Sequence, residues 1–332
     1  MGVYSMENLS RFNLIGSSPQ FQAALRQIEK MACVDVPVLI IGETGTGKEL
    51  AARALHYTGE RAAGPFVPVN CGALTEALLE SELFGHERGA FTDAKQASPG
   101  LAAEADGGTL FLDEVDALSL KAQAALLRFL QDGSYRRVGG SQVRHANVRV
   151  LVATNAALDQ LVEARQFRRD LLYRINVLTL AMPSLRQRDG DARELAQAFL
   201  RRFCHQYRVQ RQFHPDTFDY IARHDWPGNV RELENQVHRA FLLSDDGYLR
   251  LGANPLAAPI QASAPLPYKT AKARAIAEFE QRYVEGLLRC TEGNISRAAQ
   301  LAGQDRSAFG KLVRKLDLQG MGRVLPNLVN KG

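Results

Sequence analysis

The sequence predicts an α/β fold, in which helices flank a parallel sheet, followed by a small helical domain and a separate all-α module. Apolar runs rich in β-branched residues alternate with amphipathic helical segments from residue 38 to about residue 182, as in a parallel sheet wrapped by helices. From 191 to about 243 the apolar spacing is helical, and a last helical module begins near residue 269. A glycine-rich loop and a pair of carboxylates each follow a predicted strand of the sheet.

The strands are predicted where short apolar runs stand between polar turns. They are expected at residues 38–41, 66–69, 109–112, 148–153 and 177–180. In the helical part, a Trp-Pro-Gly-Asn turn at 226–229 is expected to separate two helices.

The segment that follows the first strand reads GETGTGKE. This is the Walker A spacing of a phosphate-binding loop, in which successive backbone N–H groups surround the phosphates and the lysine ammonium contacts them. We therefore expect a nucleotide at Gly42, Glu43, Thr44, Gly45, Thr46, Gly47, Lys48 and Glu49. Glu49 stands where the pattern usually has a magnesium-binding Ser or Thr, so the metal must be held by other groups.

Two adjacent carboxylates, Asp113 and Glu114, follow the strand predicted at 109–112. Parallel sheets bind ligands at the carboxyl ends of their strands, so both side chains are expected beside the nucleotide. Asp113 is the predicted Mg²⁺ ligand, directly or through water, and Glu114 is the predicted general base that polarises the attacking water. The alternative is that the two acids cap a helix that starts near Ser119. Together with the phosphate-binding loop, the two carboxylates indicate that the protein hydrolyses the nucleotide as well as binding it.

Several polar residues are candidates to assist hydrolysis. Phosphoryl transfer spreads negative charge over the equatorial oxygens, and an arginine from a neighbouring subunit is well suited to stabilise it. The candidates lie in the arginine-rich segment FRRDLLYR at 167–174, which contains Arg168, Arg169 and Arg174. Thr154 and Asn155 follow a predicted strand and are candidates to sense the γ-phosphate. Arg231, at the start of a predicted helix, is a candidate to report the nucleotide state to the helical domain.

A further segment, ELFGHERGAFTDA at 82–94, resembles the GAFTGA loop and the preceding helix of bacterial enhancer-binding proteins, the activators of sigma-54 RNA polymerase. The resemblance to their AAA+ P-loop NTPase domain is continuous from about Leu14 to Leu251. It implies hydrolysis of ATP with Mg²⁺, assembly as a homo-oligomer from dimer to hexameric ring, and remodelling of the sigma-54 RNA polymerase holoenzyme from the closed to the open promoter complex.

The resemblance also implies roles for single residues. Asn70 matches the residue that restrains the catalytic glutamate, and Glu49 is the residue that the family has after its lysine. Arg168 and Arg174 match the two arginine fingers, Thr154 and Asn155 match sensor I, and Arg231 matches the sensor II arginine. The residues that would contact sigma-54 are Gly89, Ala90, Phe91, Thr92, Asp93 and Ala94, with Phe91 and Thr92 at the tip of the loop.

Asp93 departs from the family pattern, which has Gly at that position. Asp visits positive φ at modest cost, so the loop geometry is compatible with it, while its charge alters contacts with sigma-54 or DNA. This leaves an alternative function open: a DNA-binding AAA+ regulator that has lost coupling to sigma-54. An AAA+ protein remodeller or replication factor is a third class, but it would need a substrate pore loop in place of this one.

The C-terminal module is predicted to bind double-stranded enhancer DNA. From residue 269 onward twelve Lys or Arg face six Asp or Glu, a net charge of +6 in a chain whose total is +5. Helices expected at 275–288, 293–303 and 306–316 resemble a Fis-type helix-turn-helix domain. The expected DNA contacts are Arg306, Ser307, Lys311, Arg314 and Lys315. The alternative is a helical bundle used for dimerisation.

These segments predict the domain organisation. We expect an N-terminal extension at 1–13, an AAA+ α/β subdomain at 14–182, a helical lid subdomain at 183–252, a linker rich in Ala, Pro and Ser at 253–268, and the DNA-binding domain at 269–332. About thirteen residues precede the AAA+ match, too few for a sensory domain, so control by a separate protein, such as a co-activator, or by the level of expression is expected.

Composition narrows the class of protein further. Hydrophobic residues at 45% and charged residues at 23% fit a globular protein, and no apolar run reaches the ~20 residues of a membrane span. A cytoplasmic location without membrane partners is expected. The four cysteines are far apart, which argues against a disulfide framework or a zinc site.

Overall fold

The structure, a computed structural model, describes residues 12–73, 76–91, 94–244, 247–252 and 293–315, together with residues 280, 283–284, 287–288 and 291. The chain divides into two compact units, one ending at Asn254 and the other beginning at Pro255. The predicted linker at 253–268 lies outside the described residues, as does most of the helix expected at 275–288. In the part of the chain that the structure describes, no helix is long and apolar enough to cross a membrane.

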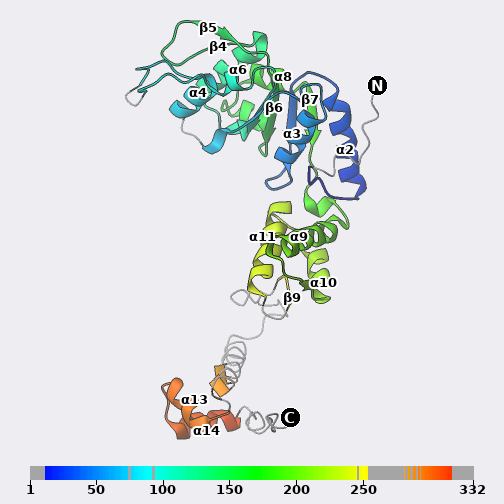
Figure 1. Ribbon diagram of the computed structural model, residues 1–332, viewed down its shortest axis with the longest axis vertical. Coiled ribbons are helices and arrows are strands. Elements are labelled where there is room, and N and C mark those ends of the chain that lie inside the picture. The colour runs from blue at the N-terminus through cyan, green and yellow to red at the C-terminus, as the bar shows by residue number, and fades with distance from the viewer. Residues whose placement is uncertain are drawn as a thin grey trace. The chain divides into compact units, whose positions relative to one another are not determined.

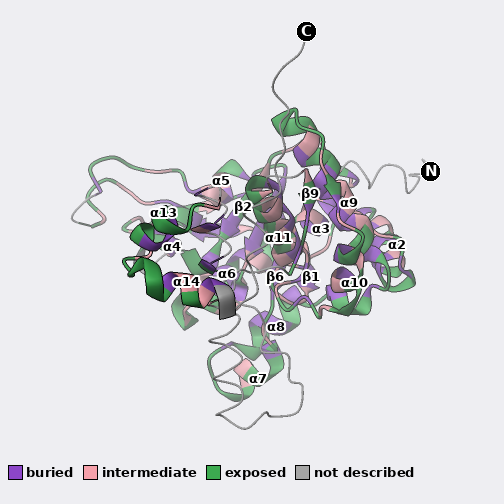
Figure 2. Ribbon diagram, turned by 90° about the horizontal axis from the view of Figure 1, so that it is seen from below, coloured by how far each residue is buried: buried purple, intermediate pink, exposed green. Residues whose placement is uncertain are grey.

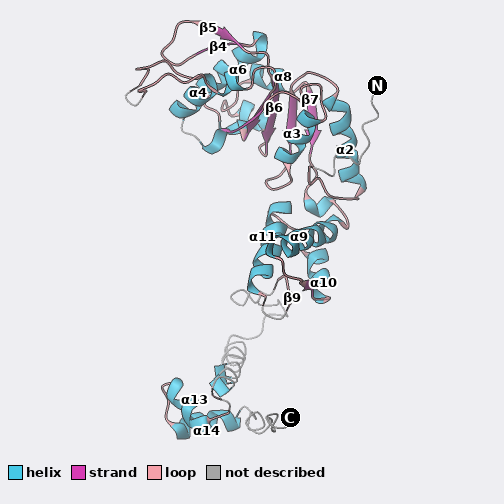
Figure 3. Ribbon diagram, in the orientation of Figure 1, coloured by secondary structure: helices cyan, strands magenta, loops and turns pink. Residues whose placement is uncertain are grey.

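A five-stranded parallel sheet lies at the centre of the first unit (Figures 1 and 3). Its order is β2-β3-β6-β1-β7, and every neighbouring pair is parallel. The strands are β1 at Val38–Ile41, β2 at Phe66–Asn70, β3 at Thr109–Asp113, β6 at Arg149–Thr154 and β7 at Leu178–Ala181. Each lies within one residue of its predicted bounds, so the predicted sheet is confirmed.

Helices cover both faces of this sheet because successive side chains of a buried strand point to opposite faces. Leu110 and Leu112 pack in one core, and Phe111 between them packs in the other. Figure 2 shows buried positions along the strands and on the helix faces turned toward them. The helices of the two layers are α2 at Pro19–Ala32, α3 at Lys48–Tyr57, α4 at Glu76–Phe84, α5 at Leu101–Glu104, α6 at Leu120–Asp132, α7 at Leu158–Glu163 and α8 at Arg169–Ile175.

A short antiparallel hairpin stands apart from the main sheet (Figure 3). It consists of β4 at Ser134–Arg136 and β5 at Val143–His145, which the sequence did not predict. Each strand has three residues, and β5 is largely exposed, so neither carries the apolar run that marks a buried strand. The hairpin matters for function because His86, at the start of the predicted sigma-54 loop, forms an isolated bridge with Val138 beside it.

The helical subdomain of the first unit has its own core, centred on the buried Trp226. Its helices are α9 at Asp191–Tyr207, α10 at Asp216–Arg223 and α11 at Asn229–Leu243. The predicted turn between α10 and α11 is confirmed, with Trp226 and Asn229 both at positive φ. Two strands of two residues each, β8 at Gln212–Phe213 and β9 at Tyr248–Leu249, form a parallel pair that the helical prediction missed.

A buried ion pair joins this subdomain to the start of the chain. The Arg188 Nε atom donates to the Asp191 carboxylate at 2.8 Å, and both side chains are almost completely buried. Asp191 also accepts the backbone N–H groups of Ser17 and Ser18 and the Ser18 hydroxyl, at 2.8 to 2.9 Å. Arg188 in turn donates to the Ile15 carbonyl at 2.6 Å. Both Asp191 oxygens and the Arg188 Nε and Nη2 atoms therefore have hydrogen-bond partners, as burial requires.

Replacing Asp191 by Ala should lower the free energy of unfolding by about 3–5 kcal/mol, because the Arg188 guanidinium would stay buried without its partner. Urea denaturation measures the change. Glu234→Ala is the matched control, since it breaks the exposed pair of Glu234 with Arg202 and should cost about 0–1 kcal/mol. Equal losses in the two variants would contradict a special role for the buried pair.

The second unit contains two described helices, α13 at Ile295–Leu301 and α14 at Arg306–Lys315. Asn294 caps α13 by accepting the N–H of Arg297 at 3.1 Å. Ala298, Ala299, Phe309 and Val313 form their buried contact. These helices lie where the sequence expects the two helices of a DNA-binding module.

Candidate nucleotide site

The register of the parallel sheet brings the predicted site residues to one edge. Asn70 at the end of β2 is paired with Asp113 at the end of β3. Thr154 at the end of β6 is paired with Ile41, which directly precedes the phosphate-binding loop. The carboxyl ends of four neighbouring strands thus place these polar side chains around the loop, at the edge where parallel sheets bind ligands.

The phosphate-binding loop presents free N–H groups at the start of α3. Among the described residues, the backbone N–H groups of Gly45, Gly47 and Lys48 donate no hydrogen bond. Gly47 precedes the helix with a φ of 94°, a conformation that glycine adopts without strain. Free N–H groups at the N-terminus of a helix attract anions, so the loop fits the phosphates of a nucleotide.

Lys48 lies half-buried within this loop. Its Nζ atom donates to the carbonyls of Gly42 at 2.9 Å and Glu43 at 3.3 Å. Burial lowers the pKa of Lys48, while the carboxylates of Asp113 and Glu114 act in the opposite direction. The ammonium is therefore held between the loop and the two acids, where it can contact the phosphates of a nucleotide.

Glu114 occupies an unusual backbone position beside the end of β2. It has a φ of 55° and a ψ of 48°, in the left-handed region. A Cβ atom on Gly72 would lie 2.2 Å from the Glu114 Oε2 atom and 3.4 Å from the Asn70 Oδ1 atom. The Glu114 carboxylate thus lies against Gly72 in its present rotamer, a contact that the sequence did not predict.

Asn70 is placed next to Glu114, as the resemblance implies. Its Oδ1 atom accepts the N–H groups of Gly72 at 2.8 Å and Ala73 at 3.1 Å. The amide oxygen is thus fixed by the turn that follows β2, with the Glu114 carboxylate against the same turn. The restraint of Glu114 by Asn70 stays a prediction, because no hydrogen bond joins the two side chains among the described residues.

A third carboxylate, Asp116, completes the acidic side of the site. Its Oδ1 atom accepts the Thr154 hydroxyl at 2.5 Å, and its charge acts on the Lys48 ammonium. Asn155 donates to the Thr44 hydroxyl at 3.0 Å, so the predicted sensor contacts the phosphate-binding loop directly. Asp116 was missed in the sequence, although it lies only two residues after Glu114.

The helical subdomain contacts the loop through the start of α11. Asn229 is fully buried, and its Nδ2 atom donates to the Thr44 carbonyl at 3.0 Å and to the Glu43 carboxylate at 3.1 Å. A Cβ atom on Gly45 would lie 2.3 Å from the Gly228 carbonyl oxygen and 3.1 Å from the Arg231 Cβ atom. Arg231 therefore begins directly over the loop, and its role in sensing the nucleotide stays a prediction.

Three residues of the loop have partners of their own. Glu43 forms an ion pair with Arg186, and this hydrogen bond lowers the pKa of the Glu43 carboxyl. Glu49 pairs with Arg53 one turn later in α3, at 2.7 Å. Thr46 is buried, and its hydroxyl donates to the Glu43 carbonyl at 2.8 Å.

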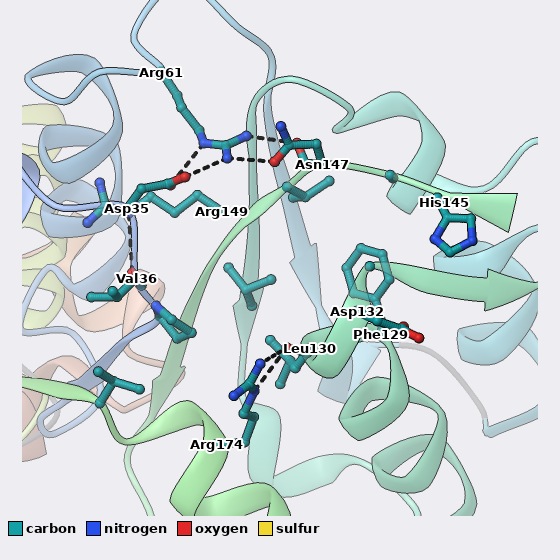
Figure 4. A pocket seen from close by; sticks show the side chains of 16 residues that line it. Asp35, Val36, Arg61, Phe129, Leu130, Asp132, His145, Asn147, Arg149 and Arg174 are labelled. Atoms are coloured by element: carbon teal, nitrogen blue, oxygen red, sulfur yellow. Dashed lines mark hydrogen bonds and ion pairs between the residues drawn. The ribbon is translucent and has the colours of Figure 1, made fainter.

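The two candidate arginine fingers have partners within the chain. Arg168 directly precedes α8, and Arg174 lies in its last turn. Arg168 is exposed and donates to Asp170 through Nε at 3.0 Å and Nη2 at 2.7 Å, which raises its pKa. Arg174 donates to the Leu130 carbonyl, at 2.9 Å from Nε and 2.7 Å from Nη2, and faces a pocket at the amino edge of the sheet (Figure 4). Among the described residues, neither guanidinium contacts the phosphate-binding loop of its own chain.

The predicted sigma-54 loop is anchored at its base. The Gly89 N–H donates to the Ala94 carbonyl at 2.8 Å, and Glu87 accepts Arg137 from the β4–β5 connection at 3.2 Å. The Phe91 ring meets His86 edge to face at 5.0 Å and is 39% exposed. Thr92 and Asp93 lie outside the described residues.

The predicted DNA contacts lie on α14. Arg306, Ser307 and Lys311 are exposed, whereas Phe309 and Val313 are buried against α13. The side chains of Arg314 and Lys315 lie outside the described set. One face of α14 thus carries polar and basic groups.

This geometry agrees with the comparisons to known families. Residues 14–181 match the sigma-54 interaction domain, and residues 186–265 match the AAA+ ATPase lid domain. The chain belongs to the family of sigma-54-dependent activators. Its α/β and helical subdomains are therefore an AAA+ ATPase domain, as the sequence predicted.

Similar proteins from this family include transcription regulators. The transcriptional regulatory protein ZraR of Salmonella typhimurium is 45% identical over 304 residues, which cover 90% of this chain and 68% of that protein. The Nif-specific regulatory protein of Rhodobacter capsulatus is 51% identical over 232 residues, or 70% of this chain and 40% of that protein. The crystal structure of NtrX from Brucella abortus in complex with ATP is 33% identical with a TM-score of 0.66, covering 91% of this chain and 68% of that one.

Proposed function

We propose that this activator hydrolyses ATP as a ring of identical subunits and uses the energy to remodel sigma-54 RNA polymerase from the closed to the open promoter complex. The observation that carries the proposal is the meeting of Lys48, Asp113 and Glu114 at one sheet edge with Arg231 of the helical subdomain directly above. The NtrX structure with ATP supports nucleotide binding at such a domain.

Each residue has a distinct role in hydrolysis. When bound, ATP supplies the phosphoryl group that is transferred to water, and Mg²⁺ neutralises charge on its oxygens. Lys48 and the free N–H groups of the loop hold the phosphates, and Asp113 is the residue to hold the metal. Glu114 accepts the proton of the attacking water, while Thr154 is oriented by Asp116.

Assembly into a ring brings a positive charge from the neighbouring subunit to the transferred phosphoryl group. Arg168 directly precedes α8 and is exposed, and it lines the same surface pocket as Tyr173, which is 74% exposed. The ion pair of Arg168 with Asp170 is exposed, so exchanging this partner for the phosphate of a neighbouring subunit costs little. We assign Arg168 as an arginine that acts in the site of the next subunit, with Arg174 as the second such residue.

The loop at 89–94 is the proposed contact with sigma-54. The ion pair of Glu87 with Arg137 and the edge-to-face contact of His86 with Phe91 fix its base, so a movement of the base is transmitted to the exposed Phe91. The exposed basic residues of α14 are assigned to enhancer DNA, where Lys and Arg contact phosphates.

Promoter opening at a supercoiled sigma-54 promoter tests this function. Phe91→Ala should abolish open-complex formation while ATPase activity stays within about threefold of wild type, because Phe91 lies outside the nucleotide site. Val34→Ala is the matched control, since it truncates an apolar side chain of similar exposure, 42%, away from the loop. It should leave both activities unchanged.

The same assay distinguishes the proposed function from the alternative, a DNA-binding regulator without coupling to sigma-54. A wild-type protein that hydrolyses ATP without opening the promoter, together with an Asp93→Gly variant that opens it, would favour a regulator that has lost its coupling to sigma-54. Opening by the wild type and by Phe91→Ala alike would remove the loop from the proposed role.

A further inference from the structure

One buried glutamine, Gln123 in α6, connects the turn that follows Glu114 with Arg168, the residue that precedes α8. Its Nε2 atom donates to the Leu118 carbonyl at 2.8 Å and to the Gln166 carbonyl at 3.0 Å. Its Oε1 atom accepts the backbone N–H of Arg168 at 2.8 Å. The side chain is fully buried, and both of its amide N–H donors and its oxygen are used.

The three partners belong to segments that are far apart in the sequence. Leu118 ends the short turn that follows Glu114, since its N–H donates to the Val115 carbonyl at 3.1 Å. Gln166 and Arg168 lie on either side of Phe167, which is buried in the core beneath α8. Gln123 therefore links Leu118, at the end of the turn that follows Glu114, to Arg168, the residue directly before α8.

The contact fixes the backbone from which the Arg168 side chain projects. The Arg168 N–H is held by Gln123, and its carbonyl accepts the N–H of Leu172 at 3.1 Å in the first turn of α8. With both backbone groups bonded, the direction of the Cα–Cβ bond is set, although the guanidinium itself is exposed. An apolar side chain at position 123 would fill the space but would leave an N–H and two carbonyls without this partner.

We propose that Gln123 is a positioning residue for Arg168, and that it serves hydrolysis in the neighbouring subunit rather than in its own. The inference rests on the proposed trans role of Arg168. A finger that is misplaced by about 1 Å loses roughly 10²-fold in rate, because transition-state stabilisation depends on geometry. Gln123→Met should therefore lower kcat by about 10- to 100-fold with little change in KM, since the phosphate-binding loop is untouched.

Mixed rings distinguish action in trans from action in cis. In a mixture of Gln123→Met and Glu114→Gln subunits, a Gln123→Met subunit keeps its own Glu114, and its neighbour can supply a well-placed Arg168. Random assembly at equal amounts creates this arrangement at roughly one quarter of the interfaces of a ring. The mixture should thus recover up to about a quarter of wild-type activity, although each variant alone is nearly inactive.

Controls separate this inference from the function on which it rests. A mixture of Arg168→Ala with Glu114→Gln should recover activity in the same way if Arg168 acts in trans. Recovery in the Arg168→Ala mixture but not in the Gln123→Met mixture would overturn the positioning role of Gln123 and leave the trans role of Arg168 intact. No recovery in either mixture would overturn both. Recovery with Gln123→Met also shows that the variant folds and assembles.

Two further variants define what the amide does. Gln123→Glu keeps an oxygen that can accept the Arg168 N–H, so its loss of kcat should be smaller than that of Gln123→Met. Gln160→Met changes an exposed glutamine of α7 and should have no effect on kcat. Equal losses for the Met and Glu variants, without recovery in mixed rings, would indicate a role in stability alone and contradict the proposal.

Discussion

Replacing Glu114 by Gln should lower kcat for ATP hydrolysis by about 10²–10⁴-fold while ATP still binds. The amide has nearly the same shape as the carboxylate but cannot accept a proton from water. Lys48 and the free N–H groups of the phosphate-binding loop are unchanged, so the Kd for the nucleotide should stay within a few-fold of the wild-type value. Phosphate release and binding of a fluorescent ATP analogue measure the two quantities.

The position of Glu114 makes this variant informative. Its carboxylate fits against Gly72, and an amide needs no more room than a carboxylate. Glu163→Gln on α7 provides a matched control, since it makes the same change on an exposed helix outside the site. Hydrolysis at the wild-type rate in Glu114→Gln would shift the role of base to another carboxylate, of which Asp116 is the nearest candidate.

Replacing Arg168 by Ala should lower kcat by about 10³–10⁵-fold, the range found for arginines that stabilise the transferring phosphoryl group. Binding of ATP to the isolated subunit should be unaffected, because Arg168 contacts Asp170 and not the phosphate-binding loop of its own chain. The ATPase rate must therefore be measured above the protein concentration at which the oligomer forms.

Arg169→Ala is the matched control for this prediction. Arg169 is also exposed and directly follows Arg168. Replacing it by Ala therefore removes one positive charge from the same end of α8. Its effect should be several-fold at most. Similar losses in the two variants would point to a general effect of surface charge on assembly, and full activity in Arg168→Ala would exclude it as the finger.

Much of the sheet could be predicted because its signals are local. Each buried strand is a short apolar run, and the polar residues that end it, such as Asp113 and Thr154, must meet at one edge of a parallel sheet. The hairpin of β4 and β5 gave no such signal, since its strands are short and partly exposed. The connection between them also bridges to His86, about fifty residues earlier, through Val138.

The residues missed in the site depend on long-range contacts. Gln123 looks like an ordinary helix residue until the Arg168 N–H is found 2.8 Å from its amide oxygen. Gly72 looks like any turn glycine until the Glu114 carboxylate is placed against it. Asn229 was predicted only as part of a turn, although its amide joins the helical subdomain to the phosphate-binding loop. Local patterns carry no information on such partners.

The central claim is that ATP turnover at Glu114 drives promoter opening. The most direct measurement is strand separation at a sigma-54 promoter, detected by permanganate reactivity, with purified wild-type protein, sigma-54 holoenzyme and either ATP or no nucleotide. We expect reactive bases only with ATP, and none when Glu114→Gln replaces the wild type. Active ATP hydrolysis without any strand separation, or equal separation in the absence of nucleotide, would contradict the claim.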